Sequence, residues 1–326
     1  MTFTDASTSA KALDYPDMPG SSTGTFGDCL ADYSPKDKPW DVHKAQSDRI
    51  ACIYASDSEF KSLGARVWAC AGELLFAWVD LPDSLPSLRL RAARFCRVRN
   101  CPVCQWRRSM MWQARFYEAL PAVQEAFPRH RWVFLTLTVK NCLVGELRAT
   151  LGAMSVAWKR FCLRPEFQVV SGWVRTTEVT KGANASAHPH YHCLLLVPPS
   201  YFGRCYVTQA RWAELWRSCA RLDYSPIVDV RAVRGDLTKA VQETLKYSVK
   251  PSDMQTDEQW FLEYTRQVHK MRFVATGGAL KGVLKPEEEI TDRDMVVLNQ
   301  DEESQLEEGS KLRFGWDRPV SRYRSS

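Results

Sequence analysis

Apolar and polar residues follow two different periods along the middle of the chain. In WVFLTLTV, residues 132–139, apolar side chains occupy one face and threonines the other, which is typical of a half-buried strand. From Val144 to Phe161 the apolar residues recur at steps of three and four, which predicts an amphipathic helix. The pattern then predicts strands at 173–180 and 188–197, a helix at about 208–222 and a strand at 226–233.

Two more helices are predicted after these strands. DLTKAVQETLKYSVK, residues 236–250, has a helical pattern, with Asp236 as a candidate N-cap and Pro251 as a stop. Another helix is expected at 256–270, before a turn at the Gly-Gly pair that begins at Gly277. Strands joined partly by hairpins and partly by helices indicate an α+β fold, in which helices pack on an antiparallel or mixed sheet.

The periodicity divides the chain into four regions. Residues 1–45 are rich in Ser, Thr, Asp, Gly and Pro, and are expected to form a disordered arm. Residues 46–130 are rich in Cys and Arg, whereas residues 131–280 contain most of the predicted strands and helices. Residues 281–326 form an acidic tail that we also expect to be disordered.

Charge is distributed unevenly along the chain. Residues 286–310 contain ten acids and one base and sum to −9, although the whole chain carries +6. The remainder therefore carries +15, which favours a polyanionic partner such as nucleic acid. The alternative is that these charges only serve solubility.

The sequence gives no indication of a membrane or secretory protein. Apolar runs fall short of the roughly 18 residues that a membrane span needs, and the first residues lack the basic-then-apolar pattern of a signal peptide. We expect a cytoplasmic protein without a membrane partner. Its eleven cysteines are then expected to be reduced thiols or metal ligands.

Three histidines stand at alternate positions in HPHYHCLLLV, residues 188–197. Since side chains alternate across a strand, His188, His190 and His192 share one face. Two imidazoles at i and i+2 can hold one divalent metal ion, and a hard ion such as Mg²⁺ or Mn²⁺ also prefers a carboxylate. The alternative is a solvated polar strand face.

Glu178 is the candidate carboxylate. The connection KGANASA, residues 181–187, predicts a hairpin. Pairing Glu178 with His190 centres this hairpin on residue 184, pairing it with His192 centres it on residue 185, and directly opposed residues share a face. A regular hairpin therefore places Glu178 beside the histidines, and a bulge would remove that register.

A tyrosine lies on the predicted helix at 236–250. Lys239, Glu243, Tyr247 and Lys250 fall on one face of that helix. A phenol is a poor nucleophile at neutral pH unless nearby positive charge favours the phenolate, and Glu243 could act as a base. The alternative is an ordinary solvated helix face.

RFCRVRNCPVCQWRR, residues 94–108, combines cysteines with arginines. Cys96, Cys101 and Cys104 have the spacing of half a zinc ribbon, and Cys70 is the nearest upstream candidate for a fourth ligand. Cys29 and Cys52 are weaker candidates, and Cys142 lies at the end of a predicted strand. Buried free thiols are the alternative. The arginines, interleaved with tryptophans, suit contacts with phosphates and bases, and we predict DNA contacts from Arg94, Arg97, Arg99, Arg107 and Arg108.

Together these motifs resemble the rolling-circle plasmid replication initiators of the His-hydrophobe-His endonuclease superfamily, in the branch typical of small Gram-positive and cyanobacterial plasmids. FLTLTVKN (134–141), HPHYHCLLLV and ETLKYSVK (243–250) resemble its three motifs in order, after the Cys-Arg segment. The likeness covers roughly residues 65 to 280.

The resemblance implies a ferredoxin-like sheet whose central strands carry the metal ligands His190, His192 and Glu178. Tyr247 would be the nucleophile that leaves a 5′-phosphotyrosyl link and a free 3′-hydroxyl, with Lys250 of the same motif as a further catalytic residue. Glu243 would activate water at termination, and His188 has no assigned role. The implied partners are plasmid origin DNA, single-stranded or extruded at the nick site, and the host helicase and DNA polymerase.

Other classes share parts of this pattern. Histidine-triad nucleotide hydrolases carry His-x-His-x-His without needing a metal, but they leave the cysteine segment and the tyrosine motif unexplained. A non-catalytic DNA-binding regulator would not need the catalytic residues. A transposase or relaxase shares the nicking chemistry, although no Walker A pattern of a helicase occurs here.

Overall fold

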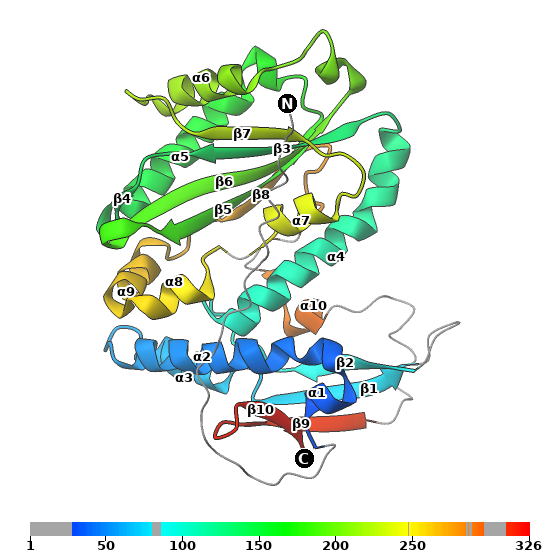
Figure 1. Ribbon diagram of the computed structural model, residues 1–326, viewed down its shortest axis with the longest axis vertical. Helices are drawn as coiled ribbons and strands as arrows, with labels where there is room; N and C mark the ends of the chain where they lie inside the picture. Colours follow the sequence, from blue (N-terminus) through cyan, green and yellow to red (C-terminus); the bar gives the residue numbers. More distant parts are fainter. Residues whose placement is uncertain (1–27, 80–85, 247, 285, 287–288, 297–310) are drawn as a thin grey trace, which may run out of the picture.

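The computed structural model describes residues 28–79, 86–246, 248–284, 286, 289–296 and 311–326. The described residues form two antiparallel sheets with helices packed on them, which confirms the expected α+β class (Figure 1). The helix α4, residues Pro102–Ala126, runs from the smaller sheet to the larger one and connects them.

The larger sheet contains six strands. Its order is β7 (Val228–Ala232), β3 (Arg131–Thr138), β6 (Ser186–Val197), β5 (Gly172–Lys181) and β8 (Val274–Gly278), and β4 (Cys142–Leu143) pairs with β6. The strand that carries the histidines therefore lies in the middle of the sheet. Such a position is buried on both faces, which explains why the run after His192 is continuously apolar.

The two faces of β6 meet different surroundings, because its side chains alternate. Tyr191 points toward the helices α5 (Leu147–Cys162) and α6 (Gln209–Ala220), where its ring lies 6.0 Å from that of Trp158 and 6.1 Å from that of Trp216. His190 and His192 point to the opposite face. One face of the sheet therefore packs against aromatic core residues, and the other face carries the polar histidine side chains.

The smaller sheet has the order β10 (Arg322–Ser325), β9 (Lys311–Asp317), β1 (Glu73–Val79) and β2 (Ser87–Ala93). The N-terminal helices that accompany this sheet are α1 (Leu30–Tyr33), α2 (Pro39–Ala55) and α3 (Lys61–Ala69). The remaining helices are α7 (Thr238–Thr244), α8 (Pro251–Thr256), α9 (Glu258–Gln267) and α10 (Asp292–Val296). Short 3₁₀ turns occur at Pro35–Asp37, Val144–Glu146, Pro165–Phe167, Ala183–Ala185 and Pro199–Phe202.

Most predicted elements of the larger sheet are confirmed to within a few residues, but the helix expected at 236–250 is too long. α7 ends at Thr244, because residues far away in the sequence form hydrogen bonds with the main-chain carbonyls at its end. The Thr176 hydroxyl donates to the Thr244 carbonyl, and the Ser109 hydroxyl donates to the Leu245 carbonyl at 2.6 Å. The expectation that Lys239, Glu243, Tyr247 and Lys250 share one face of a single helix is therefore wrong, because Lys250 lies beyond the end of α7.

Both chain ends also differ from the expectation of disorder. α1 and the start of α2 fall within the predicted N-terminal arm, and β9 and β10 fall within the predicted acidic tail. Phe314 and Tyr323 have no exposed surface. Because residues 286–310 are strongly acidic, the prediction of disorder was extended over the apolar residues that follow them. Residues 1–27 and 297–310 lie outside the described residues.

Candidate active site

The hairpin of β5 and β6 brings two histidines and a glutamate together. The strands pair in unbroken register, and Glu178 lies directly opposite His190, as the predicted hairpin requires. Nε2 of His190 and Nε2 of His192 each lie 2.8 Å from the same Glu178 oxygen, Oε2. All three residues are buried, and their ligand atoms are close enough to hold one metal ion.

The outer nitrogens of the two imidazoles also have partners. His190 Nδ1 lies 3.3 Å from the His188 carbonyl, and His192 Nδ1 lies 3.4 Å from the Thr136 hydroxyl. Without a metal ion, Nε2 of each ring is placed to donate to Glu178, whereas with an ion at Nε2 the proton would move to Nδ1 and be donated to these oxygens. Such outer contacts fix the ring orientation of metal-binding histidines. The donor set therefore fits a divalent ion.

His188 is not part of this cluster. Its half-buried ring lies 5.4 Å from the ring of His190, between centroids, and only its carbonyl approaches an imidazole nitrogen. His188 thus contributes to the cluster through its main chain.

Lys246 is a residue of the site that the sequence analysis missed. Its Nζ lies 2.7 Å from Glu178 Oε2 and 2.7 Å from Glu243 Oε1. Glu243 Oε1 in turn lies 3.8 Å from His192 Nε2. The local signal was the spacing of Glu243 and Lys246, which are neighbours on α7 and its end. Its contact with Glu178 is a long-range one, and no local pattern indicates it.

These contacts shift the charge of the groups that they join. Burial opposes the ionisation of Glu178, but hydrogen bonds from His190, His192 and Lys246 hold its pKa well below the usual range. Burial lowers the pKa of His192 despite its contact with Glu178. Burial also works against the charge of Lys246, yet its bonds to the two carboxylates raise its pKa. The site therefore contains an ionised carboxylate, a neutral imidazole and an ammonium group.

The tyrosine motif lies against β5. Besides the bond from Thr176 to Thr244, the amide of Val179 donates to the Ser248 carbonyl at 2.9 Å. Tyr247 itself lies outside the described residues. Lys250 precedes α8 and is exposed, so in the described part of the chain the lysine that touches the acids is Lys246.

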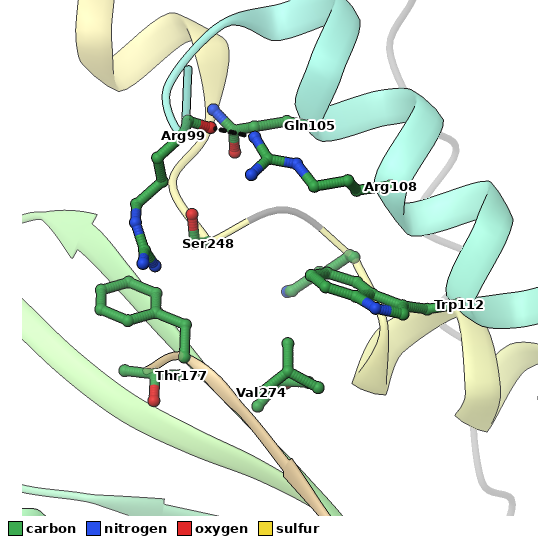
Figure 2. Close-up of a pocket in the computed structure, with 10 residues that line it drawn as sticks. Arg99, Gln105, Arg108, Trp112, Thr177, Ser248 and Val274 are labelled. Carbon is green, nitrogen blue, oxygen red and sulfur yellow. Dashed lines mark hydrogen bonds between the residues drawn. The ribbon is translucent and has the colours of Figure 1, made fainter. Parts of the chain in front are cut away.

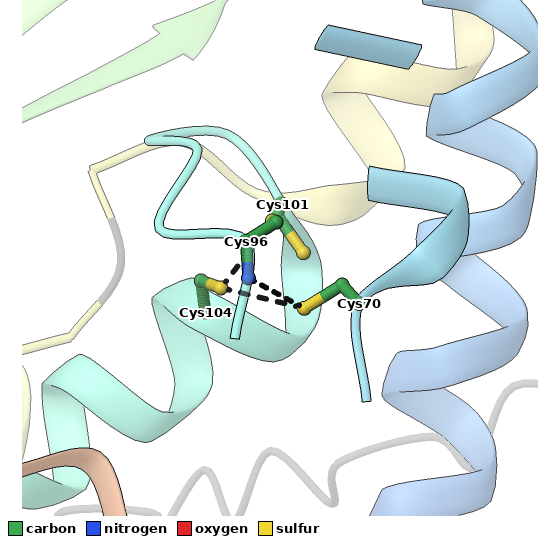
Figure 3. Close-up of side chains that lie close together, drawn as sticks. All are labelled: Cys70, Cys96, Cys101 and Cys104. Atoms are coloured by element: carbon green, nitrogen blue, oxygen red, sulfur yellow. Dashed lines mark hydrogen bonds between the residues drawn. The ribbon is translucent and has the colours of Figure 1, made fainter. Parts of the chain in front are cut away.

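The four predicted cysteines form a second cluster (Figure 3). Their sulfur atoms lie within 4.8 Å of one another, so the cluster could hold a metal ion. Cys70 follows α3, Cys96 follows β2, and Cys101 and Cys104 begin α4, so the cluster joins three elements. The Ser47 hydroxyl on α2 lies 3.5 Å from the Cys101 sulfur.

The five predicted DNA-binding arginines fall into two groups. Arg94 and Arg97 are exposed and Arg99 is half-buried. Arg107 and Arg108 are only 5% and 4% exposed, and they donate hydrogen bonds to main-chain carbonyls, including those of α10. The expectation that these two arginines contact DNA is therefore wrong, because their guanidinium groups stabilise the packing of α4.

A small pocket lies between the first part of α4 and the larger sheet (Figure 2). Arg99 and residues of α4 form one side, and residues of β5 and β8 form the other. Its full lining is Arg99, Gln105, Arg108, Trp112, Thr176, Thr177, Lys246, Ser248, Phe273 and Val274. Because Lys246 belongs to this lining, the pocket lies directly beside the site.

The chain is similar to known replication proteins. Residues 87–324 match the family described as "Replication protein". "Protein rep" of Streptococcus pneumoniae is 32% identical over 302 residues, which cover 88% of this chain and 92% of that protein. The protein of the same name from Lactiplantibacillus plantarum is 32% identical over 305 residues, covering 86% and 93%.

Two further comparisons bear on the chain. "Protein rep" of Lentilactobacillus hilgardii is 33% identical over 283 residues, covering 82% of this chain and 88% of that protein. No solved structure matches. Among the helices of the described residues, none has the length and apolar character that crossing a membrane requires. Motifs, fold and relatives agree, and the chain belongs to the replication protein family, as a rolling-circle initiator of plasmid replication.

Proposed function

We propose that the protein nicks one strand of its plasmid origin with Tyr247 as the nucleophile, in a reaction that depends on a divalent metal ion. The observation that carries the proposal is the convergence of His190, His192 and Glu178 on one point. Lys246 and Glu243 lie at its edge. This arrangement suits phosphoryl transfer, in which negative charge on the phosphate must be stabilised.

The metal ion would be held by His190, His192 and Glu178. Mg²⁺ or Mn²⁺ at these ligands would polarise the scissile phosphate and stabilise the charge that develops on it. The ionised Glu178 and the neutral His192 are already in the form that binds a metal ion. Lys246 offsets the negative charge of Glu178 and Glu243 and would also favour an incoming phosphate.

The proposed nicking step is a transesterification. The Tyr247 hydroxyl oxygen forms a bond to phosphorus while the bond from phosphorus to the 3′ oxygen breaks. The phenol proton passes to a base, and the 3′ oxygen takes up a proton to become the hydroxyl that primes synthesis. Because a phosphate ester replaces a phosphate ester, the strand can later be rejoined by attack of a 3′-hydroxyl on the phosphotyrosyl link.

Glu243 would end the reaction by activating water. The water oxygen forms a bond to phosphorus, Glu243 accepts its proton, and the bond to the tyrosine oxygen breaks. The Glu243 side chain is 47% exposed, so water can reach it. Lys250 is proposed as a further basic residue near the DNA backbone. The host helicase and DNA polymerase would extend the primer after the nick.

The cysteine cluster is proposed to hold a structural Zn²⁺ ion. Four thiols on three elements are a closed ligand set, which suits a structural site rather than a catalytic one. The purified protein should contain about one zinc ion per chain, lost in Cys104→Ser but kept in Cys52→Ser, whose cysteine is exposed. Equal zinc content in both variants would remove the proposal.

The nickase proposal is tested with a supercoiled plasmid that carries the cognate origin. In Mg²⁺ or Mn²⁺ the wild-type protein should relax the plasmid and become covalently attached to DNA, whereas EDTA should stop both. Tyr247→Phe should abolish attachment, and Tyr206→Phe, at an exposed tyrosine far from the motif, should retain it. Mass spectrometry of the DNA-linked peptide identifies the nucleophile. Full attachment by Tyr247→Phe would refute the assignment.

A further inference from the structure

A hollow of about 390 Å³ opens beside the cysteine cluster. It lies between the end of α3, the segment that follows β2 and the start of α10. Cys70 and Cys96 form part of its wall. Small-molecule sites in proteins have volumes of about 300–1,000 Å³, so the hollow is large enough for a ligand that reaches these thiols.

Of the four thiols in the cluster, Cys96 is the accessible one. Cys70, Cys101 and Cys104 are at most 1% exposed, whereas Cys96 is half-buried. The Cys104 sulfur lies 3.6 Å from the sulfur of Cys96 and 3.6 Å from that of Cys70 (Figure 3). A reagent that enters the hollow therefore meets Cys96 first, and a second thiol lies within reach of the first.

The charged residues of the hollow are three arginines and one acid. Arg66, Arg94 and Arg97 are all exposed. Arg66 donates a hydrogen bond of 2.6 Å to the Cys96 carbonyl, which holds its guanidinium group beside this residue. Arg97 lies 3.9 Å from Asp292, the acid of the lining. Three positive charges and one negative charge leave the lining with a net charge of +2, which attracts anions toward the thiol.

We propose that Cys96 is a site of reversible modification by small anionic disulfides, for which glutathione disulfide is the probe. The Cys96 sulfur forms a bond to one sulfur of the probe, and the disulfide bond of the probe breaks. The other half leaves with the electron pair as a thiolate and takes up a proton from water.

Cys104 is placed to complete the exchange, because its sulfur lies 3.6 Å from that of Cys96. Its attack on the Cys96 sulfur forms a Cys96–Cys104 disulfide, and the second small thiolate leaves and takes up a proton. Two cysteines are oxidised, and one disulfide is reduced to two thiols. A zinc ion in the cluster would lose two of its four ligands. The inference rests on the proposed zinc site for this readout alone, because the modification of a thiol can be measured without a metal.

The first measurement uses the purified full chain with a small excess of glutathione disulfide. Mass spectrometry after alkylation of the remaining thiols locates the modified cysteine, and a chromophoric chelator reports zinc release. The first adduct should form on Cys96, followed by the Cys96–Cys104 disulfide and the release of about one zinc ion per chain. Dithiothreitol with Zn²⁺ should restore the starting state. A first adduct on the exposed Cys52, with the cluster unmodified, would overturn the proposal.

The second measurement compares glutathione disulfide, an anion at neutral pH, with cystamine, a cationic disulfide. The ratio of their rates at Cys96 reports how the hollow selects charge. Arg94→Gln/Arg97→Gln should lower this ratio at least about fivefold, because two cations near the thiol are removed. Arg204→Gln/Arg217→Gln removes the same charge from exposed positions on and just before α6. This control should leave the ratio within about twofold of the wild-type value.

The exposed Cys52 of the same chains is the internal reference. An unchanged ratio at Cys96 in the Arg94→Gln/Arg97→Gln variant, or an equal fall at Cys52, would overturn the proposal. The site of the first adduct is located in the wild-type chain, so this result holds even if a variant fails to fold. If the wild-type chain holds no zinc but Cys96 forms the charge-dependent adduct, only the zinc proposal fails. If zinc is present and Cys96 does not react, only the present inference fails.

Discussion

At the scale of single residues, Lys246 is the group that offsets the negative charge of the two carboxylates in the site. Its ammonium is shared by Glu178 and Glu243, two carboxylates that would otherwise lie close together with no positive charge between them. The ammonium and a divalent ion would both be attracted to the same Glu178 oxygen. Lys246 therefore sets how strongly the acids attract a metal ion.

Lys246→Met is expected to strengthen Mn²⁺ binding several-fold and to slow nicking. The substitution removes a positive charge 2.7 Å from a ligand oxygen, which makes the site more attractive to a cation. Electron paramagnetic resonance of free Mn²⁺ measures the affinity. Lys250→Met, at an exposed lysine, serves as the control and should leave Mn²⁺ affinity unchanged. Weaker Mn²⁺ binding by Lys246→Met would show that the lysine supports the ion instead.

The pH dependence of Mn²⁺ binding is a second prediction at this scale. A proton competes with the ion for an imidazole, and burial lowers the pKa of His192 below its ordinary value of 6.5. Glu178 stays ionised, because its pKa is also lowered. Protons should therefore compete with the ion for His192 only below pH 6.5, and most of the affinity should remain as pH falls from 8 to 6.5. His188→Ala should show the same curve. A loss of half the affinity above pH 6.5 would contradict the shift.

At the scale of elements, the end of α7 determines where the tyrosine motif lies. Hydrogen bonds from Thr176 and Ser109 hold the carbonyls of Thr244 and Leu245 outside a helical path. The bond from Val179 to Ser248 then holds the segment against β5. Metal ligands and tyrosine motif therefore share one strand as their support.

Thr176→Val should loosen this segment while leaving the metal ligands in place. The buried Thr244 carbonyl loses a donor, which costs about 1–3 kcal/mol of the free energy of unfolding. Urea unfolding measures the loss, and nicking should fall while Mn²⁺ affinity stays the same. Thr180→Val makes the same chemical change on the same face of β5 at a half-buried position. An equal effect of both substitutions would refute a specific role of the Thr176 bond.

At the scale of the whole molecule, the C-terminus completes the smaller sheet. β9 lies between β1 and β10, and the buried Tyr323 hydroxyl donates to the carbonyl of Ala71, next to Cys70. The end of the chain therefore supports the element that holds the cysteine cluster. A truncation at about residue 285 that is meant to remove only the acidic tail would also remove these two strands.

Phe314→Ala is expected to destabilise the protein by about 3–5 kcal/mol, since it leaves a cavity at a fully buried aromatic position. Thermal unfolding measures the effect, and zinc content should fall with it if the sheet supports the cysteines. Val320→Ala, in the exposed turn between β9 and β10, should change stability by less than about 0.5 kcal/mol. A stable Phe314→Ala variant would mean that the strand is dispensable.

The sequence by itself determined the strands β3, β5, β6 and β7 and the histidine site. Alternation placed His190 and His192 on one face, and the length of the hairpin placed Glu178 beside them, opposite one or the other; the structure shows that it is His190. Both follow from local geometry, which a period of two residues and a short turn define completely. The spacing of Cys96, Cys101 and Cys104 also indicated a metal cluster, with Cys70 as the nearest upstream candidate for the fourth ligand, and the structure brings all four together.

Only the tertiary structure decided the rest. The contact of Lys246 with Glu178, the end of α7 at Thr244, the burial of Arg107 and Arg108, and the strands β9 and β10 all depend on partners far away in the chain. Composition predicted exposed arginines and a disordered tail, because charged residues are usually solvated. Long-range hydrogen bonds to main-chain carbonyls and the burial of a few aromatic side chains outweighed that preference, and neither leaves a local pattern in the sequence.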